Sequence, residues 1–273
     1  MEQRPQDLLA SVDPEILHAV SGRAREIARG ASIGSKLAAA LALGSIPVAL
    51  GAVARDLYGQ APSDLLDVLQ FALLLEQLES ELYTRAVAAN VLIPASDLTV
   101  ITTIRRHESE HVSALRDLIT GKGATPAAKP AFDFTAHGNL PGFDFGAAQY
   151  ATFTALAQAF EDTGVRAYKG QVGRLVNDKA VLTTALAIHS VEARHASEIR
   201  RLRGRKGWIT SSNRDELPAF LQGVYDGEDN VVQGGVNLTA IAASVGGVAS
   251  ATEAFDEPLT RQQVTDIVAP FLA

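Results

Sequence analysis

One charged pattern, which occurs twice along the chain, constrains the fold more than any other feature. Its order is Glu, Glu-x-x-His, Glu, Glu-x-x-His, and its members are Glu76, Glu108, His111, Glu161, Glu192 and His195. The two ends of a Glu-x-x-His motif share one face of a helix, so each motif offers a carboxylate and an imidazole to the same side. The nearly equal spacing of the two halves indicates an internal repeat of a helical hairpin.

Apolar periodicity predicts four long helices around these residues. We expect them at about residues 63–90, 95–120, 144–176 and 179–203. Ser63-Asp64 and Ser96-Asp97 provide N-cap residues for the first two. Residues 121–146 contain five Gly and three Pro with little periodicity, which predicts a connector long enough to cross a bundle from end to end. Because Ala and Leu dominate and only 6% of the residues are aromatic, the predicted fold class is all-α.

Helix geometry indicates that the repeated residues meet in one layer. If the first hairpin turns near residues 91–96, Glu76 lies about 21 Å before the turn and Glu108 about 18 Å after it, at about 1.5 Å per residue. If the second turns near Asn177, the corresponding distances for Glu161 and Glu192 are about 24 Å and 22 Å. Four carboxylates and two imidazoles at one level match the ligand set of a dinuclear metal site. Oxygen ligands with two imidazoles suit iron first, with manganese or zinc as alternatives.

Composition excludes several other chemistries. The chain has no cysteine, so it has no iron–sulfur cluster, thiol catalysis or rubredoxin-type electron donor. Its single methionine is Met1, so an axial methionine for a haem has no internal candidate, and we expect no haem. A net charge of −7 makes nucleic acid an improbable partner.

The chain resembles the ferritin-like superfamily, and within it the bacterial ferritin-like domain proteins related to the plant desiccation-related protein. The segments that carry the resemblance are FALLLEQLESELYTRA, TTIRRHESEHVSALR, LAQAFEDTGVRAYKGQ, IHSVEARHASEIRRLRG and EAFDEPLTRQQV. By position, the family's metal ligands would be the six residues of the repeat; which carboxylates bridge the two metals stays open. The resemblance implies a ferritin-like four-helix bundle with a long crossover.

Several residues near the six predicted ligands are candidates for an alternative ligand or for a group that contacts a ligand. Glu79 competes with Glu76 as the first ligand, and we favour Glu76 because the third helix has Gly164 where Glu79 would align. Tyr83 and Tyr168 each follow a ligand glutamate by seven residues on the same helix face. They are candidates for groups that contact the metal ligands or for electron sources near the metals, and the alternative is that they are ordinary core tyrosines. His189 is a candidate for a similar supporting position. His107 lies about 100° from the ligand face and is expected outside the site.

The two ends of the chain flank this predicted bundle of residues 61–204. Residues 1–60 form a helical or signal-like segment, in which residues 37–54 are uncharged and could contact a membrane. Gly22-Arg23-Ala24-Arg25 lacks the adjacent arginines of a twin-arginine signal, so both the cytoplasm and the cell envelope or periplasm stay open. Residues 205–273 form a C-terminal extension that wraps the bundle or joins a neighbour, with a short helix at 260–272 capped by Thr260. We expect a homo-oligomer formed through the bundle or this extension.

Two hypotheses for the function follow. In the first, the protein oxidises Fe(II) or detoxifies peroxide or O2 as a ferroxidase, peroxidase or catalase-like oxidoreductase. In the second, it is a non-enzymatic structural or stress-protective protein whose metal site is structural or vacant.

Overall fold

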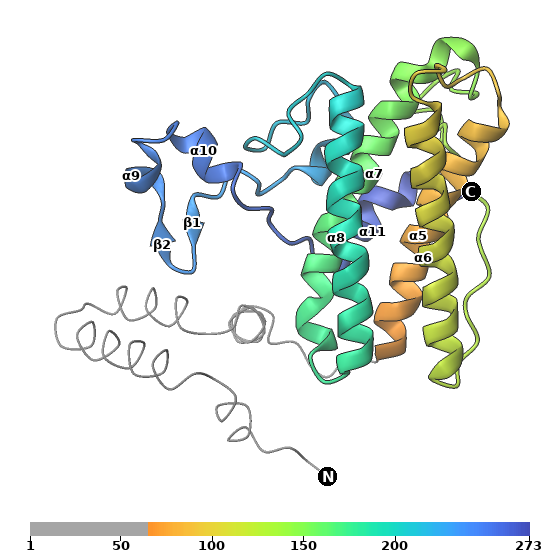
Figure 1. Ribbon diagram of the computed structural model, residues 1–273, viewed down its shortest axis with the longest axis horizontal. Helices are drawn as coiled ribbons and strands as arrows, with labels where there is room; N and C mark the ends of the chain where they lie inside the picture. The colour runs from red at the N-terminus through yellow and green to blue at the C-terminus, as the bar shows by residue number, and fades with distance from the viewer. Residues whose placement is uncertain (1–64) are drawn as a thin grey trace. The chain divides into compact units, whose positions relative to one another are not determined.

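The computed structural model describes residues 65–273, so the predictions for residues 1–60, including the membrane contact at 37–54, lie outside the described residues. Its bundle consists of four long helices: α5 (Leu65–Ala88), α6 (Leu98–Gly121), α7 (Tyr150–Leu175) and α8 (Lys179–Leu202). α5 packs along α6 and α7 along α8, and α5 also lies against α7 (Figure 1). The all-α fold, with two helical hairpins in one bundle, is therefore confirmed. None of the helices in this range is long and apolar enough to cross a membrane.

The connector between the hairpins, residues 122–146, runs along α5 before it reaches α7 (Figure 1). Gln70 donates to the Thr125 carbonyl and accepts from the Ala127 amide, each at 2.8 Å. Further along α5, Glu81 pairs with Lys129. The connector is thus held along successive turns of α5, as a crossover between hairpins requires.

Two of the predicted helix starts need correction. The third long helix begins at Tyr150 rather than near Asp144, because Asp144 bonds the Gly146 amide at 2.8 Å in a tight turn. A short 3-10 helix, η1 (Ala147–Gln149), precedes α7. At α6, Asp97 is the N-cap residue but makes no capping hydrogen bond; its carboxylate instead accepts from the Tyr150 hydroxyl at 2.6 Å.

The C-terminal extension returns to α7 through two of its short elements, and whether its apolar middle wraps the bundle or joins a neighbour stays a prediction. Its elements are η2 (Ala219–Val224), β1 (Val232–Gln233), β2 (Val236–Asn237), α9 (Thr239–Ala242), α10 (Val248–Thr252), α11 (Arg261–Val268) and η3 (Ala269–Phe271). Thr260 caps α11 in a capping box with Gln263, as predicted. η2 and α11 both pack on α7. β1 and β2 form an antiparallel hairpin at Val232–Asn237, which belongs to a different compact unit from the bundle.

The bundle interior has apolar residues at both ends and charged residues between them. Ile104 and Ile199 belong to one apolar cluster, which also includes residues of the extension. Leu115 and Ile188 belong to the other. On α6 and α8 the two Glu-x-x-His motifs lie between these clusters, so the fold places them in the middle of the bundle.

Candidate metal centre

The six residues of the repeat come together in the middle of the bundle, and all six are buried. Their ligand atoms form two overlapping groups, within each of which the atoms lie within 4.8 Å of one another. One group consists of Glu76, Glu108, His111 and Glu192, and the other of Glu108, Glu161, Glu192 and His195. Glu108 and Glu192 belong to both groups and therefore lie between the two imidazoles.

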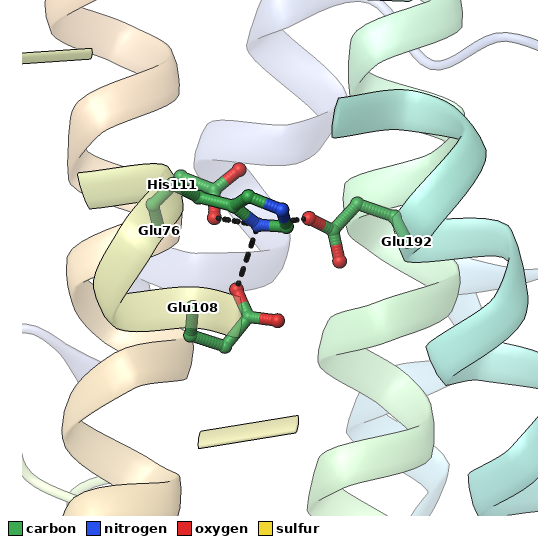
Figure 2. Close-up of side chains that lie close together, drawn as sticks. All are labelled: Glu76, Glu108, His111 and Glu192. Atoms are coloured by element: carbon green, nitrogen blue, oxygen red, sulfur yellow. Dashed lines mark hydrogen bonds and ion pairs between the residues drawn. The ribbon is translucent and has the colours of Figure 1, made fainter. Parts of the chain in front are cut away.

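His111 is the centre of the first group (Figure 2). Its Nδ1 lies 2.9 Å from an oxygen of Glu192, 3.1 Å from Glu76 and 3.5 Å from Glu108. These carboxylates reach the imidazole from three different helices, α5, α6 and α8, and all point inward (Figure 2). One nitrogen that faces three carboxylates at once has the surroundings of a metal ligand.

His195 repeats this arrangement on the other side. Its Nδ1 lies 2.8 Å from Glu108, 3.2 Å from Glu192 and 3.4 Å from Glu161. The second half therefore draws its carboxylates from α6, α7 and α8. With both halves together, every helix of the bundle contributes at least one carboxylate.

Within the described residues, four carboxylate oxygens of this layer have no hydrogen-bond partner. They are Oε1 and Oε2 of Glu108, Oε2 of Glu161 and Oε1 of Glu192. Each lies within 3.5 Å of an imidazole Nδ1, but without the geometry of a hydrogen bond. Buried anionic oxygens without donors are costly, whereas cations placed among them would provide the missing compensation. The residues present therefore fit metal ions with a preference for oxygen and imidazole ligands.

The electrostatics of the carboxylates show the cost of this crowding. Burial and the charge of Glu192 raise the pKa of both Glu79 and Glu108 well above the usual value. Burial also raises the pKa of Glu161 to about 7, although His195 opposes the shift. In the absence of metal ions, protonation of some of these carboxylates lowers the electrostatic free energy of the layer.

Glu192 differs from the other carboxylates because both imidazoles contact it. Burial raises its pKa, but His111 and His195 outweigh burial and lower it to about 2. In turn, burial lowers the pKa of His111, whereas the surrounding carboxylates raise it to about 12. The pKa of His195 is raised for the same reason. The metal-free layer thus uses its imidazoles as the counter-charges of its glutamates.

The two tyrosines bond across the bundle in a reciprocal pattern. Tyr83 on α5 donates to Glu161 on α7 at 2.5 Å, and Tyr168 on α7 donates to Glu76 on α5 at 2.6 Å. Both hydroxyls therefore contact predicted ligands. The sequence spacing placed each tyrosine on the face of its own helix's glutamate, but the actual partner is the glutamate of the opposite helix.

Glu79 lies at the edge of the cluster, and it is buried with the others. A Cβ atom added at Gly164 would lie 3.0 Å from Glu79 Oε1. Gly164 thus provides the space that Glu79 occupies, which explains why the two halves of the repeat differ here. Glu79 belongs to neither group of converging ligand atoms, so the geometry favours Glu76 as the ligand on α5.

The two remaining histidines differ from each other. His189 Nδ1 has no hydrogen-bond partner in the described part of the chain. Burial and the charge of Lys169 lower the pKa of His189, while Asp256 and, more weakly, Glu192 oppose the shift. Its supporting role stays a prediction. His107 belongs to neither group of converging ligand atoms, but its Nδ1 lies 3.0 Å from His195 Nε2, with the ring centroids 5.2 Å apart and the ring planes nearly parallel. The side chain of His107 lies about 100° around α6 from the ligand face. On that side of α6 it faces α8, which carries His195.

A bundle of two hairpins in which all four helices contribute buried carboxylates, and α6 and α8 also contribute imidazoles, is the arrangement of a ferritin-like protein. A model of the ferritin-like domain family matches residues 64–205, and the chain belongs to this family. A search of the curated proteins found no match.

Proposed function

We propose that the protein is a dinuclear metal carboxylate protein, with iron as the first candidate and manganese as the alternative, that oxidises Fe(II) or detoxifies peroxide or O2. Zinc, which has no redox chemistry, would suit only a structural site. The observation that carries the proposal is the set of four unpartnered carboxylate oxygens around two imidazoles in the middle of the bundle. Such a set is compensated best by two cations. Iron or manganese in it would supply the electrons for reduction of O2 or peroxide.

The two groups of ligand atoms suggest how the residues divide between two ions. Glu76 and His111 would hold one ion, and Glu161 and His195 the other. Glu108 and Glu192, which belong to both groups, would bridge the pair. Tyr83 and Tyr168 would orient Glu161 and Glu76 through their hydroxyls.

Turnover as a peroxidase, in contrast to catalase-like disproportionation of two H2O2 molecules, would depend on an external electron donor. Reduction of H2O2 to two molecules of water consumes two electrons and two protons. The chain has no cysteine that could hold an iron–sulfur or rubredoxin-type donor. The electrons would therefore come from Fe(II) itself or from a separate reductant.

A structural role is the second candidate, and one observation favours it. The clustered ligands come from all four long helices, so bound ions would cross-link the bundle. In that case the protein would act in stress protection, as its sequence resemblance to the desiccation-related proteins suggests, and would need no turnover.

Metal analysis and a matched set of variants separate these functions. We expect about two Fe or Mn ions per chain in protein purified from its native source, and fewer in Glu108→Ala and His111→Ala. Asp117→Ala is the control, because Asp117 is exposed on α6 and belongs to neither group of ligand atoms. If the first two variants lose O2 or H2O2 consumption but stay folded, the role is catalytic. If the wild type consumes neither and the variants lose only stability, the metal is structural. Protein that neither contains metal nor takes up Fe(II) anaerobically would contradict both.

A further inference from the structure

His107 makes the two halves of the centre unequal. His195 Nδ1 faces the carboxylates, and its other nitrogen, Nε2, lies 3.0 Å from His107 Nδ1. The rings are nearly parallel, with an interplanar angle of 10°. No other imidazole in residues 65–273 forms a hydrogen bond to Nε2 of either predicted histidine ligand.

The internal repeat shows where the corresponding residue of the other half would be. His107 precedes His111 by one helical turn on α6, and Val191 precedes His195 by one turn on α8. Valine has no hydrogen-bonding side chain. The repeat therefore gives His195 a partner from α6 but offers His111 no such partner from α8.

A hydrogen bond to the outer nitrogen of a ligating histidine has two effects. It fixes the ring orientation and the tautomer, and it increases the basicity of the inner nitrogen. When Nδ1 of His195 binds an ion, Nε2 carries the proton and can donate it to His107 Nδ1. His107 then carries its own proton on Nε2, which Arg106 contacts at 3.1 Å in the metal-free arrangement. Arg106 can release this contact because Glu110 is its second partner, at 2.8 Å.

We propose that His107 is a positioning residue that makes the half formed by Glu161 and His195 the tighter of the two metal positions, so that the two ions bind in order. This inference rests on the proposed dinuclear centre. Loss of such an outer partner lowers metal affinity about 10–100-fold. The two ions should therefore bind in separate steps, and the first step should depend on His107.

The test is a titration of the metal-free full chain with Mn(II), followed by calorimetry and by electron paramagnetic resonance. In the wild type we expect a tight first step, with the signal of an isolated ion, and a weaker second step that couples the two ions. His195→Ala should abolish the tight step, whereas His111→Ala should leave it. His107→Phe keeps the ring but removes the hydrogen bond, and it should weaken the tight step about 10–100-fold.

Two further variants distinguish positioning from general damage to the fold. His107→Asn keeps an acceptor near the position of Nδ1 and should restore part of the affinity. Val191→Ala, at the equivalent position of the repeat, should leave both steps unchanged. If His107→Phe binds the first ion as tightly as the wild type, or if the wild type binds both ions with equal affinity, the inference is wrong. If the wild type binds no ion, the proposed function itself fails.

Discussion

At the scale of single residues, the layer of buried glutamates connects metal binding to protonation. Burial and mutual repulsion raise the pKa values of Glu76, Glu79, Glu108 and Glu161 in the metal-free protein. An acid whose pKa is higher in the folded state stabilises the fold below its unfolded pKa and loses this contribution as the pH rises through the folded value. A bound cation reverses the preference because it favours the charged form.

We therefore predict that the free energy of unfolding of the metal-free protein falls between about pH 4.5 and pH 7. Glu161 alone, whose pKa rises from 4.5 to about 7, accounts for about 3 kcal/mol. The raised pKa of His111 acts in the same direction above pH 6.5. Urea denaturation after EDTA treatment at pH 5 and pH 7.5 measures the effect, and Glu161→Gln should reduce it. A metal-free protein that gains stability over this range would contradict the prediction.

The tyrosine hydroxyls offer a second residue-scale prediction. Among residues 65–273, the Tyr83 hydroxyl is the donor that bonds Glu161 Oε1, and Oε2 has no donor, so Tyr83→Phe leaves both oxygens without one. We expect a loss of about 1–3 kcal/mol in the free energy of unfolding, because a buried acceptor is left unpaired. Tyr150→Phe is the control, since its hydroxyl bonds Asp97 in a less buried place away from the cluster. Urea denaturation of both variants should show the larger loss for Tyr83→Phe; equal losses would count against this account.

At the scale of elements, the sequence predicted the positions of the helices well, but it did not predict the side-chain contacts between different helices. Apolar periodicity located all four long helices, although α7 buries every side of its middle because α5, α8 and the extension all pack on it. It could not show that Asp97 bonds Tyr150 rather than capping α6, or that His107 reaches α8. Both contacts join separate helices, and their geometry depends on packing. The six ligand candidates were found because they repeat, whereas His107 has no equivalent in the second half and therefore gave no signal.

Gly170 provides a test at the element scale, where the extension crosses α7. A Cβ atom there would lie 2.0 Å from the Leu259 carbonyl oxygen, which belongs to the backbone. Gly170→Ala should therefore displace the extension, break the hydrogen bond from the Leu259 amide to the Arg166 carbonyl and cost about 1–3 kcal/mol. Gly121→Ala is the control: it has nothing within 4 Å and should be neutral or slightly stabilising. Urea denaturation measures the free energy of unfolding of the two variants. Equal values would show that the extension can move away from α7 without a loss of stability.

At the scale of the whole molecule, the extension and the bundle share one core. Leu259, Val264 and Phe271 of the extension belong to the same apolar cluster as Phe160 of α7. Arg166, almost fully buried, reinforces this contact with polar bonds. It donates to the carbonyls of Val224, Asp226 and Glu257 and pairs with Glu228. One side chain of α7 thus holds separate segments of the extension.

We predict that the extension and the bundle unfold together and that Arg166→Met destabilises both by about 3–5 kcal/mol, because it leaves the buried Glu228 without its counter-charge. Glu228→Gln in the same chain should recover part of the loss. Lys169→Met is the control, since Lys169 donates to a single carbonyl of the extension, that of Asp256. Urea denaturation and native-state hydrogen exchange measure the effect. If the amides of α11 exchanged well before those of α7, the extension would be a separate unit, and Arg166 would hold it without stabilising the bundle. If they exchange together, the shared core makes the extension part of the fold that carries the centre.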